Sequence, residues 1–541
     1  MSTTETVPSS TLTTTTPVGP VGPVGRVGPV GATLAGQLAG QLAGHRKHLA
    51  LVAMLFAVSM TFIDQTIVAI ASPSIQSQLD LSRTGTQWVV NAYLLALAAT
   101  FALGGRLADV IGSRRMVLLG ISGFAVTSAL CGLTPHGHLA EPWIVGFRIL
   151  QGISGALMIP AALAVVVAAF PVAERGRALA LFFGVSGGLT AVGPIAGGYL
   201  TQWTWRAIFW INIPIAILAL VLTACAGIPS VRRAERIDLR GAALVALGMG
   251  LSVLGFEQAA VWGWRSPLTW GSLVAGVAVL AVFAAVELRT KSPLVRLRIF
   301  AAREFVVDNL VLFLAMVAFV PTFFFASVYA QVSLGYDANR AGLYLLMFFG
   351  GFAPAAQLGG RMLDRSGARR PMVLGSALGA TGFALWAQHL HEYSLGAQWP
   401  YLLMAGAGIG LLLGPASTDA VNRAIDASYG EVTGITQTVR NYASSLGLAV
   451  LGTVLTTVLT GHLTSSLVGL GVPHSQAAQI AGDAARGGSP RPGSTPPAIA
   501  DHLHAVVVHD FATATQGVLY GMAIALGLAL LAALRYPRRS H

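Results

Sequence analysis

The chain has 541 residues, of which 54% are hydrophobic and only 10% are charged. Soluble domains carry about a quarter charged residues, so this composition excludes an ordinary soluble protein and indicates one that lies in a lipid bilayer. The net charge of +12 does not indicate nucleic acid as a partner, because the basic residues are spread between apolar runs and form no single basic face. With two cysteines in the whole sequence, neither a disulfide framework nor a metal site is predicted.

Residues 1–47 are a low-complexity tail that includes PVGPVGPVG and LAGQLAGQLAG. A few glycine-containing triplets without partner strands predict a disordered or polyproline-like segment, not collagen. No cleavable signal peptide is predicted, because the first apolar run begins near residue 49 and is longer than a signal-peptide core. The run should therefore remain as the first membrane span.

Apolar runs of about 20 residues, long enough to cross a hydrocarbon core of about 30 Å as helices, recur from residue 48 to residue 535. A transmembrane β-barrel would show short alternating segments instead. The predicted fold class is an all-α integral membrane protein with 14 transmembrane helices. The predicted spans are residues 48–72, 87–108, 115–134, 142–168, 177–200, 206–227, 239–259, 268–287, 303–330, 340–362, 371–390, 398–422, 433–460 and 514–535.

Arginine and lysine are concentrated in the connections that follow even-numbered spans. Positive residues mark cytoplasmic loops, so both termini are predicted to be cytoplasmic. The arginine-dominated, alanine-rich composition suggests a bacterial source with GC-rich DNA. The predicted location is therefore the inner or plasma membrane of a bacterial cell.

One charged stretch occurs twice, as GRLADVIGSRR at 105–115 and as GRMLDRSGARR at 360–370. The two copies take equivalent places, after the second span of each half, if two extra spans separate two six-helix bundles. Internal repeats of this kind build many secondary transporters, whose substrate site lies between the repeats. The predicted domains are the cytoplasmic tail (1–47), an N-terminal six-helix bundle (48–229), a two-helix insertion with its linkers (230–302), and a C-terminal six-helix bundle (303–541) that includes a long outer loop (461–513).

The duplicated loop is predicted to have a gating role. Glycines permit a tight turn, and a carboxylate there can pair with arginines or face a helix N-terminus. Control of topology by the arginines is the simpler alternative, but the aspartate retained in both copies favours contacts between the bundles that close the cytoplasmic side. The residues assigned to the gating loop are Gly105, Asp109, Gly112, Arg114, Arg115 and Asp364.

Asp64 is the strongest single candidate for function. It lies about 16 residues into the first span, roughly 24 Å along the helix, where an ionised carboxylate is costly and marks a functional site by default. Arg148 in the fourth span lies at a compatible depth and is its predicted partner. Asp64 and Arg148 are therefore assigned to proton coupling or substrate binding. The alternatives are a permanent ion pair that only supports packing, and an Arg148 side chain that snorkels to the surface.

Several stretches together resemble the major facilitator superfamily, specifically its fourteen-span drug:proton antiporter family. The resemblance covers about residues 48–535 and rests on the duplicated loop, FIDQTIVAIASPSI (62–75), RILQGISGALMIP (148–160), GPIAGG (193–198) and WRAIFWINIPI (205–215). It implies that the fifth span carries the family's antiporter motif, at Gly193, Pro194, Gly197 and Gly198. Leu189 stands where that motif usually has glycine. Small residues and proline also permit close, bent packing, which is the simpler alternative.

Polar side chains inside other spans are weaker candidates for the lining of a central cavity. Each can equally bond a neighbouring helix, and Arg440 lies about 12 Å from the cytoplasmic end, near enough to snorkel. No acidic residue lies centrally in the ninth to eleventh spans, so coupling is predicted to depend on the first half. The cavity candidates are Gln87, Asn91, Tyr93, Gln357, Gln437, Arg440 and Asn441.

DHLHAVVVHD (501–510) contains three histidines, but their irregular spacing favours a solvated loop over a zinc site. No enzyme, no cofactor other than the proton as coupling ion, and no ATPase domain in the chain are predicted, because no phosphate-binding glycine loop ends in Lys-Ser or Lys-Thr.

The predicted function is export of lipophilic small molecules, such as drugs or antibiotics, driven by the proton-motive force through alternating access. One alternative is a proton-coupled importer or a narrow-substrate metabolite transporter. Another is a non-transporting membrane receptor on a transporter scaffold, which should tolerate neutralisation of Asp64.

Overall fold

The computed structural model describes residues 29–171, single positions between 174 and 189, and residues 192–227, 238–290, 293–422, 429–485 and 497–537. The chain divides into two compact units, residues 1–46 and 47–541, and the fold below is that of the second unit. Helix α1 begins at Pro29, inside the segment predicted to be a tail, whereas residues 1–28 lie outside the described residues.

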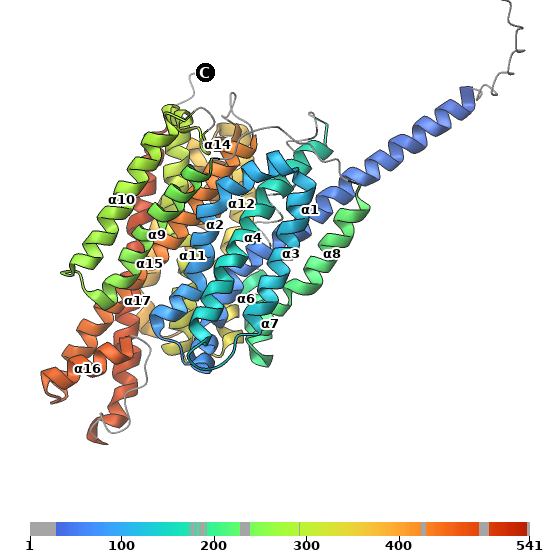
Figure 1. Ribbon diagram of the computed structural model, residues 1–541. Helices are drawn as coiled ribbons and strands as arrows, with labels where there is room; N and C mark the ends of the chain where they lie inside the picture. The colour runs from blue at the N-terminus through green and yellow to red at the C-terminus, as the bar shows by residue number, and fades with distance from the viewer. Residues whose placement is uncertain are drawn as a thin grey trace, which may run out of the picture. The chain divides into compact units, whose positions relative to one another are not determined.

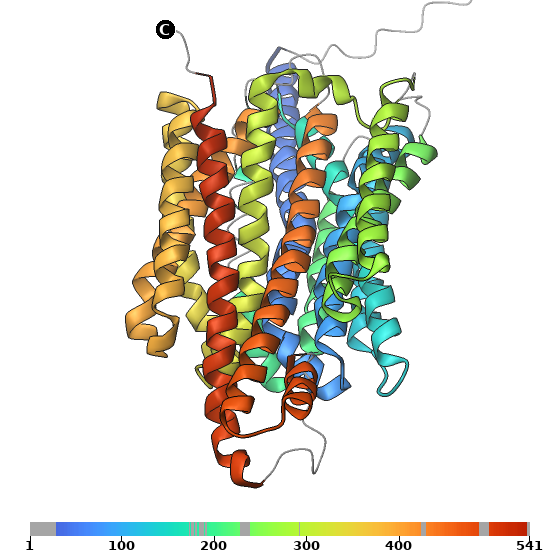
Figure 2. The ribbon, with the colours of Figure 1, turned by 90° about the vertical axis from the view of Figure 1, so that its left-hand side faces the viewer.

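The described part is helical apart from short connections. Its helices are α1 (Pro29–Leu79), α2 (Arg83–Ile111), α3 (Ser113–Gly132), α4 (Ala140–Ala169), α6 (Val192–Trp203), α7 (Ala207–Trp210), α8 (Asn212–Cys225), α9 (Leu239–Trp262), α10 (Pro267–Glu287), η1 (Leu297–Ala301), α11 (Arg303–Val332), α12 (Ala338–Ser366), α13 (Arg369–Gln388), η2 (Leu390–Glu392), α14 (Leu395–Asn422), α15 (Tyr429–Gly469), α16 (His474–Ala485) and α17 (Pro497–Leu534). Figures 1 and 2 show the long helices side by side.

Twelve helices in the described part are long and apolar enough to cross a membrane. They coincide with twelve of the predicted spans, so the prediction of an all-helical membrane protein is confirmed. Predicted span 371–390 forms α13, a helix that is not among those twelve. Predicted span 177–200 lies partly outside the described residues, and only its last part is seen, as α6. The count of 14 therefore stays a prediction.

Residues 461–513 do not form the long loop that was predicted. In the described part of this range, α15 continues to Gly469, α16 follows, and α17 already begins at Pro497. Residues 498–516 contain neither glycine nor proline, which is why the helix that precedes the last span can run on without a break. DHLHAVVVHD is therefore helical.

The two copies of the charged stretch form the same turn. Gly112 ends α2 with a φ of 108°, and Gly367 ends α12 with a φ of 76°. Only glycine adopts this backbone conformation without strain, so both copies need it where one helix stops and the next begins. In both halves the turn joins the second predicted span to the third.

Glycines also give the two halves matching helix contacts. In the first half, α2 packs on α4, where Gly104 lies against the backbone oxygen of Ala156 and leaves no room for a Cβ atom. In the second half, α12 packs on α14, where Gly351 lies in the same way against the oxygen of Leu403. Close approach through small residues is characteristic of membrane helices.

Helices α9 and α10 pack on each other, and α9 also packs on α2 and α15 (Figure 1). The hydroxyls of Ser252 and Tyr442 lie 2.7 Å apart, and Thr453 donates a hydrogen bond of 2.7 Å to the oxygen of Phe256. Arg106 of the duplicated stretch donates to the oxygen of Pro293, in the segment after α10, at 2.6 Å. The α9–α10 pair is therefore bonded to both halves along their contact.

Candidate functional site

Asp64 and Arg148 form a buried ion pair within the first half of the chain. Arg148 Nη1 donates to Asp64 Oδ2 at 2.5 Å, and neither side chain is exposed at all. The structure thus brings together the two residues that the sequence paired, one from α1 and one from α4. It also excludes the alternative that Arg148 snorkels to the surface.

Gln151 is a third member of the site, which the sequence reasoning missed. Its Oε1 accepts a hydrogen bond of 2.7 Å from Arg148 Nη1, and its Nε2 donates to Asp64 Oδ1 at 3.2 Å. The side chain is fully buried. Its spacing from Arg148 could have identified it, because a residue three positions after Arg148 lies on the same face of the helix as Arg148.

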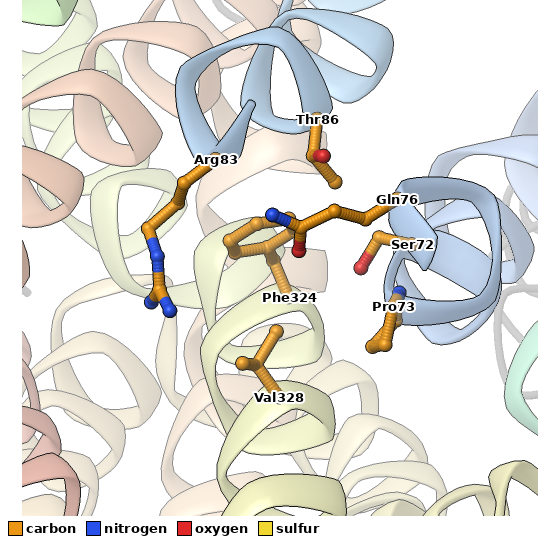
Figure 3. Close-up of a pocket in the computed structure, with 7 residues that line it drawn as sticks. All are labelled: Ser72, Pro73, Gln76, Arg83, Thr86, Phe324 and Val328. Atoms are coloured by element: carbon orange, nitrogen blue, oxygen red, sulfur yellow. The ribbon is translucent and has the colours of Figure 1, made fainter. Parts of the chain in front are cut away.

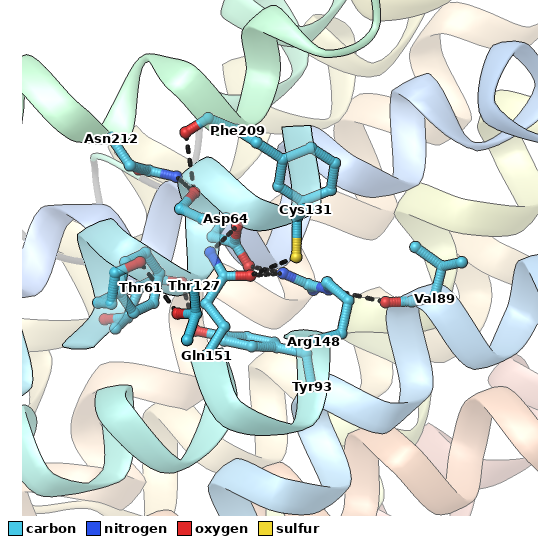
Figure 4. A network of polar contacts seen from close by, with 12 residues as sticks. Thr61, Asp64, Val89, Tyr93, Thr127, Cys131, Arg148, Gln151, Phe209 and Asn212 are labelled. Carbon is cyan, nitrogen blue, oxygen red and sulfur yellow. Dashed lines mark hydrogen bonds and ion pairs between the residues drawn. The ribbon is translucent and has the colours of Figure 1, made fainter. Parts of the chain in front are cut away.

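Helix α2 completes the surroundings of Arg148 (Figure 4). Arg148 Nε donates to the oxygen of Val89 at 2.8 Å, and its guanidinium carbon lies 4.2 Å from the centre of the Tyr93 ring. Arg148 Nη2 is buried without a hydrogen-bond acceptor among the described residues. The guanidinium therefore has one nitrogen that can donate a hydrogen bond to a new acceptor if the ion pair opens.

A second group of polar contacts supports the wall behind the ion pair. Asn212 Nδ2 donates to Ser128 Oγ at 2.9 Å, and that hydroxyl donates to the oxygen of Phe209 at 2.8 Å. The Phe209 ring lies 5.9 Å from the guanidinium of Arg148. These bonds join α3 to α7 and α8 and hold the Phe209 ring at the ion pair (Figure 4).

Polar side chains of α2 connect this site to the second half. Asn91, two residues beyond Val89, accepts a hydrogen bond from Ser445 on α15 and is fully buried. Gln87 is also buried and lies against Gly452 of α15. These two predicted cavity residues therefore lie at the contact of the halves, whereas Tyr93 donates to the oxygen of Thr61 at 3.3 Å within the first half.

The polar face of α15 carries three of the predicted cavity residues. Arg440 Nη1 donates to Gln437 Oε1 at 2.8 Å. Arg440 Nε and Asn441 Nδ2 are buried without acceptors among the described residues. Asn441 precedes Ser445 by one helical turn, so it lies near the face that contacts α2. This face therefore keeps polar groups available for a further partner.

Gln357 lies on the side of α12 that does not contact α14. It is exposed on α12, whereas Gly351 and Gly359 of the same helix lie against α14. Position 357 is about 200° around the helix from position 359, so it faces away from α14. The assignment of Gln357 to the lining of a cavity stays a prediction.

The gating loop shows a graded exposure. Asp109 and Arg114 are half-buried, whereas Arg115 and Asp364 are exposed. The contact between the bundles that is predicted for Asp364 stays a prediction, and its side chain is exposed in this conformation. Gly105 lies opposite Pro160 of α4 at ordinary contact distance.

The glycines of the antiporter motif place α6 between the two halves. Gly193 and Gly197 lie against α1, at Thr66 and Ile67, and Gly198 lies against the backbone of Ala338 at the start of α12. Pro194 lies in α6. The motif thus provides close contacts to a helix of each half.

We use the term α1–α2 end for the end at which residues 80–82 connect α1 to α2. Three contacts join the halves there. Gly198 meets Ala338, Gln331 Nε2 donates to the oxygen of Ile70 at 3.4 Å, and the guanidinium of Arg83 lies 5.3 Å from the Phe511 ring centre. In this conformation the α1–α2 end is therefore held closed by contacts from α6, α1 and α2.

Comparison with known proteins gives the family. Residues 54–448 match the model of the Major Facilitator Superfamily. The chain is 33% identical over 499 residues to the tetracenomycin C resistance and export protein of Streptomyces glaucescens, with 91% of each chain covered. It is 35% identical over 428 residues to a puromycin resistance protein of Streptomyces alboniger, with 77% of this chain and 84% of that protein covered.

The chain also shares its fold with a solved structure. The crystal structure of a D-xylose-proton symporter superposes with a TM-score of 0.56 and covers 82% of this chain and 98% of its own, at 15% sequence identity. The match to the family model includes Asp64, Arg148 and Gln151 as well as both copies of the charged stretch. The chain is therefore a multi-pass membrane transporter that belongs to the major facilitator superfamily, and not an enzyme.

Proposed function

We propose that the chain is a drug:proton antiporter, which exports lipophilic small molecules such as drugs or antibiotics from a bacterial cell. Export is supported by relatives that are named for resistance and export. The observation that carries proton coupling is the Asp64–Arg148 pair, whose carboxylate is fully buried in a helix long enough to span the membrane. An ionised side chain at that depth in a membrane is energetically costly, and such residues usually have a function in transport or proton transfer.

In this proposal the proton and the substrate compete for Asp64. A proton on Asp64 removes the charge that holds Arg148 Nη1, and the guanidinium then moves toward its other acceptors, Gln151 Oε1 and the oxygen of Val89. Val89 belongs to α2, the helix that also bonds Ser445 of the second half through Asn91. Helix α2 is therefore the element by which a change at Asp64 reaches the contact between the halves.

The proposed architecture has 14 spans, with a two-helix insertion between two six-helix bundles and with both termini in the cytoplasm. This orientation makes the α1–α2 end external. Alternating access then consists of opening this end while the cytoplasmic end closes, around a site between the bundles. Helix α6, whose glycines meet both α1 and α12, would seal the external end against proton leak.

The test of the proposed function is efflux of ethidium from energised cells that express the full chain. We expect efflux against the dye gradient, and an uncoupler should abolish it because the proton-motive force is the energy source. Uncoupler-sensitive accumulation of ethidium would instead support the importer. Transport of no small molecule, together with a phenotype insensitive to changes at Asp64, would support a receptor.

Gln151→Leu should lower ethidium efflux by about five- to tenfold. Leucine fills a similar volume but removes the bonds to both Arg148 and Asp64, and a buried polar group left without its partner costs about 1–3 kcal/mol. The matched control is Gln388→Leu, an exposed glutamine at the end of α13, which should leave efflux unchanged. Equal efflux in both variants would show that Gln151 does not position the ion pair.

A further inference from the structure

A small cavity of about 20 Å³ lies between α1, α2 and α11 at the α1–α2 end. This volume holds about one water molecule, so the cavity is nearly closed in this conformation. Figure 3 shows the side chains of Gln76 of α1 and Arg83 of α2 on two sides of Phe324 of α11. The cavity therefore lies where the first half of the chain meets the second.

Two hydrogen-bond donors at this cavity lack acceptors. Arg83 Nε and Gln76 Nε2 are both buried and have no hydrogen-bond partner among the described residues. The neighbouring hydroxyls are already used, because Ser72 donates to the oxygen of Ala69 at 2.8 Å and Thr86 donates to the oxygen of Ser82 at 2.9 Å. Buried donors usually have acceptors, and the described residues supply none here, so these two donors can bind a water molecule or a ligand oxygen.

The charge of the site is positive. Arg83 is the one charged residue among those that line the cavity in the described part of the chain. The carboxylate of Glu141 on α4 also approaches α2, but it lies against Gly85, about 200° around the helix from Arg83. Helix α2 begins at Arg83, so its dipole adds further positive potential. An anion fits this site, and a cation does not.

We propose that Arg83 and Gln76 bind the anionic group, a carboxylate or phenolate, of an acidic aromatic substrate as it leaves the protein. This inference rests on the proposed function, because it takes the α1–α2 end as the external, exit end. A guanidinium and an amide can both donate to one acidic oxygen group. Phe324 and Val328 supply an apolar wall for the aromatic ring beside it.

The closed cavity is too small for a drug-sized molecule, so the subsite acts when the halves separate. Gln76 and Arg83 belong to the first half, whereas Phe324 and the Phe511 ring under Arg83 belong to the second. Opening the α1–α2 end therefore separates Arg83 from Phe511 and leaves its guanidinium facing the exit path. Substrates without an acidic group gain nothing from these donors.

The experiment compares two xanthene dyes of opposite charge, fluorescein (anionic) and rhodamine 6G (cationic), by fluorescence polarisation with the purified full chain in detergent. We expect saturable binding of fluorescein to the wild type, about tenfold weaker binding to Arg83→Gln, and a smaller loss for Arg83→Lys, which keeps the charge but not the planar fork. Rhodamine 6G should bind Arg83→Gln as it binds the wild type, which also shows that the variant is folded.

Phe511→Leu is the matched control, because it removes the ring contact of Arg83 and keeps the charge. If Arg83 were only a latch between the halves, Phe511→Leu and Arg83→Gln would change the binding of both dyes alike, and the proposal would be overturned. Absence of saturable fluorescein binding to the wild type would overturn it too. If Arg83→Gln does not fold, Gln76→Leu replaces it, with an expected loss of about threefold for fluorescein alone.

The proposed function fails by a different result, since it depends on energised, uncoupler-sensitive ethidium efflux and not on dye binding in detergent. A chain that exports ethidium but shows the same fluorescein affinity with and without Arg83 would keep the proposed function and lose the anion subsite.

Discussion

Asp64→Asn should reduce uncoupler-sensitive ethidium efflux to the level of cells that lack the protein. Asparagine has the shape of a protonated aspartate and can still accept from Arg148, but it cannot release or take up a proton. Because the proton and the substrate compete for Asp64, this imitation of the protonated side chain should also bind ethidium more weakly. Efflux assays in energised cells measure the loss, and a pH indicator in weakly buffered detergent solution measures the protons released when ethidium binds. Only the wild type should release them.

Asp80→Asn is the matched control for this change. Asp80 is an exposed carboxylate just beyond the end of the same helix, and its φ of 53° is a backbone conformation that asparagine adopts as readily as aspartate. Ethidium efflux by Asp80→Asn should stay within about twofold of the wild type, because the Asp80 carboxylate is exposed to water and the loss of its charge has little effect. If Asp64→Asn exports ethidium as fast as Asp80→Asn, proton coupling does not depend on Asp64.

The sequence predicted the ion pair because charges are conspicuous in an apolar chain. Asp64 and Arg148 interrupt long hydrophobic runs, and helical rise alone gave them compatible depths. The same reasoning passed over Gln151, since an uncharged amide costs less in a membrane helix and stands out less among glycines and alanines. Its role depends on the position of Asp64 on another helix, which no local pattern gives.

The sequence alone does not show which neighbouring helix a side chain faces. Gln357 is polar and lies within an apolar span, but its direction is fixed by the contact of Gly351 and Gly359 with α14. Gly198 was predicted to permit close packing, yet only the three-dimensional structure shows that the helix it meets, α12, belongs to the other half. Spacing along one helix identifies a face of that helix, whereas the partner of that face comes from tertiary packing.

Arg148→Gln should lower the thermal stability of the purified protein at neutral pH more than Asp64→Asn or Gln151→Leu. Removing one member of a buried ion pair costs about 3–5 kcal/mol, because the remaining charge is left without compensation. Asp64 would keep only the bond from Gln151. In Arg148→Gln, acid protonates the Asp64 carboxylate, which has lost its partner, and so removes the uncompensated charge. The difference in Tm between the wild type and Arg148→Gln should therefore become smaller as the pH falls. Arg265→Gln, at an exposed loop arginine, should show no such deficit.

The double variant Asp64→Asn/Arg148→Gln tests whether the two side chains stabilise the protein as a pair or independently of each other. With both charges gone, two neutral amides lie beside Gln151, and no buried charge remains to be compensated. We therefore expect the double variant to be more stable than Arg148→Gln alone, although it changes one more residue of the native site. Effects of substitutions at residues in direct contact are not additive. Asp64→Asn alone should lower the Tm less than Arg148→Gln alone. In Asp64→Asn, Arg148 still contacts the oxygen of Val89, Gln151 and the Tyr93 ring. Additive losses in Tm would contradict the pair. A restored Tm together with lost efflux would show that the pair is retained for coupling, since the fold is then stable without it.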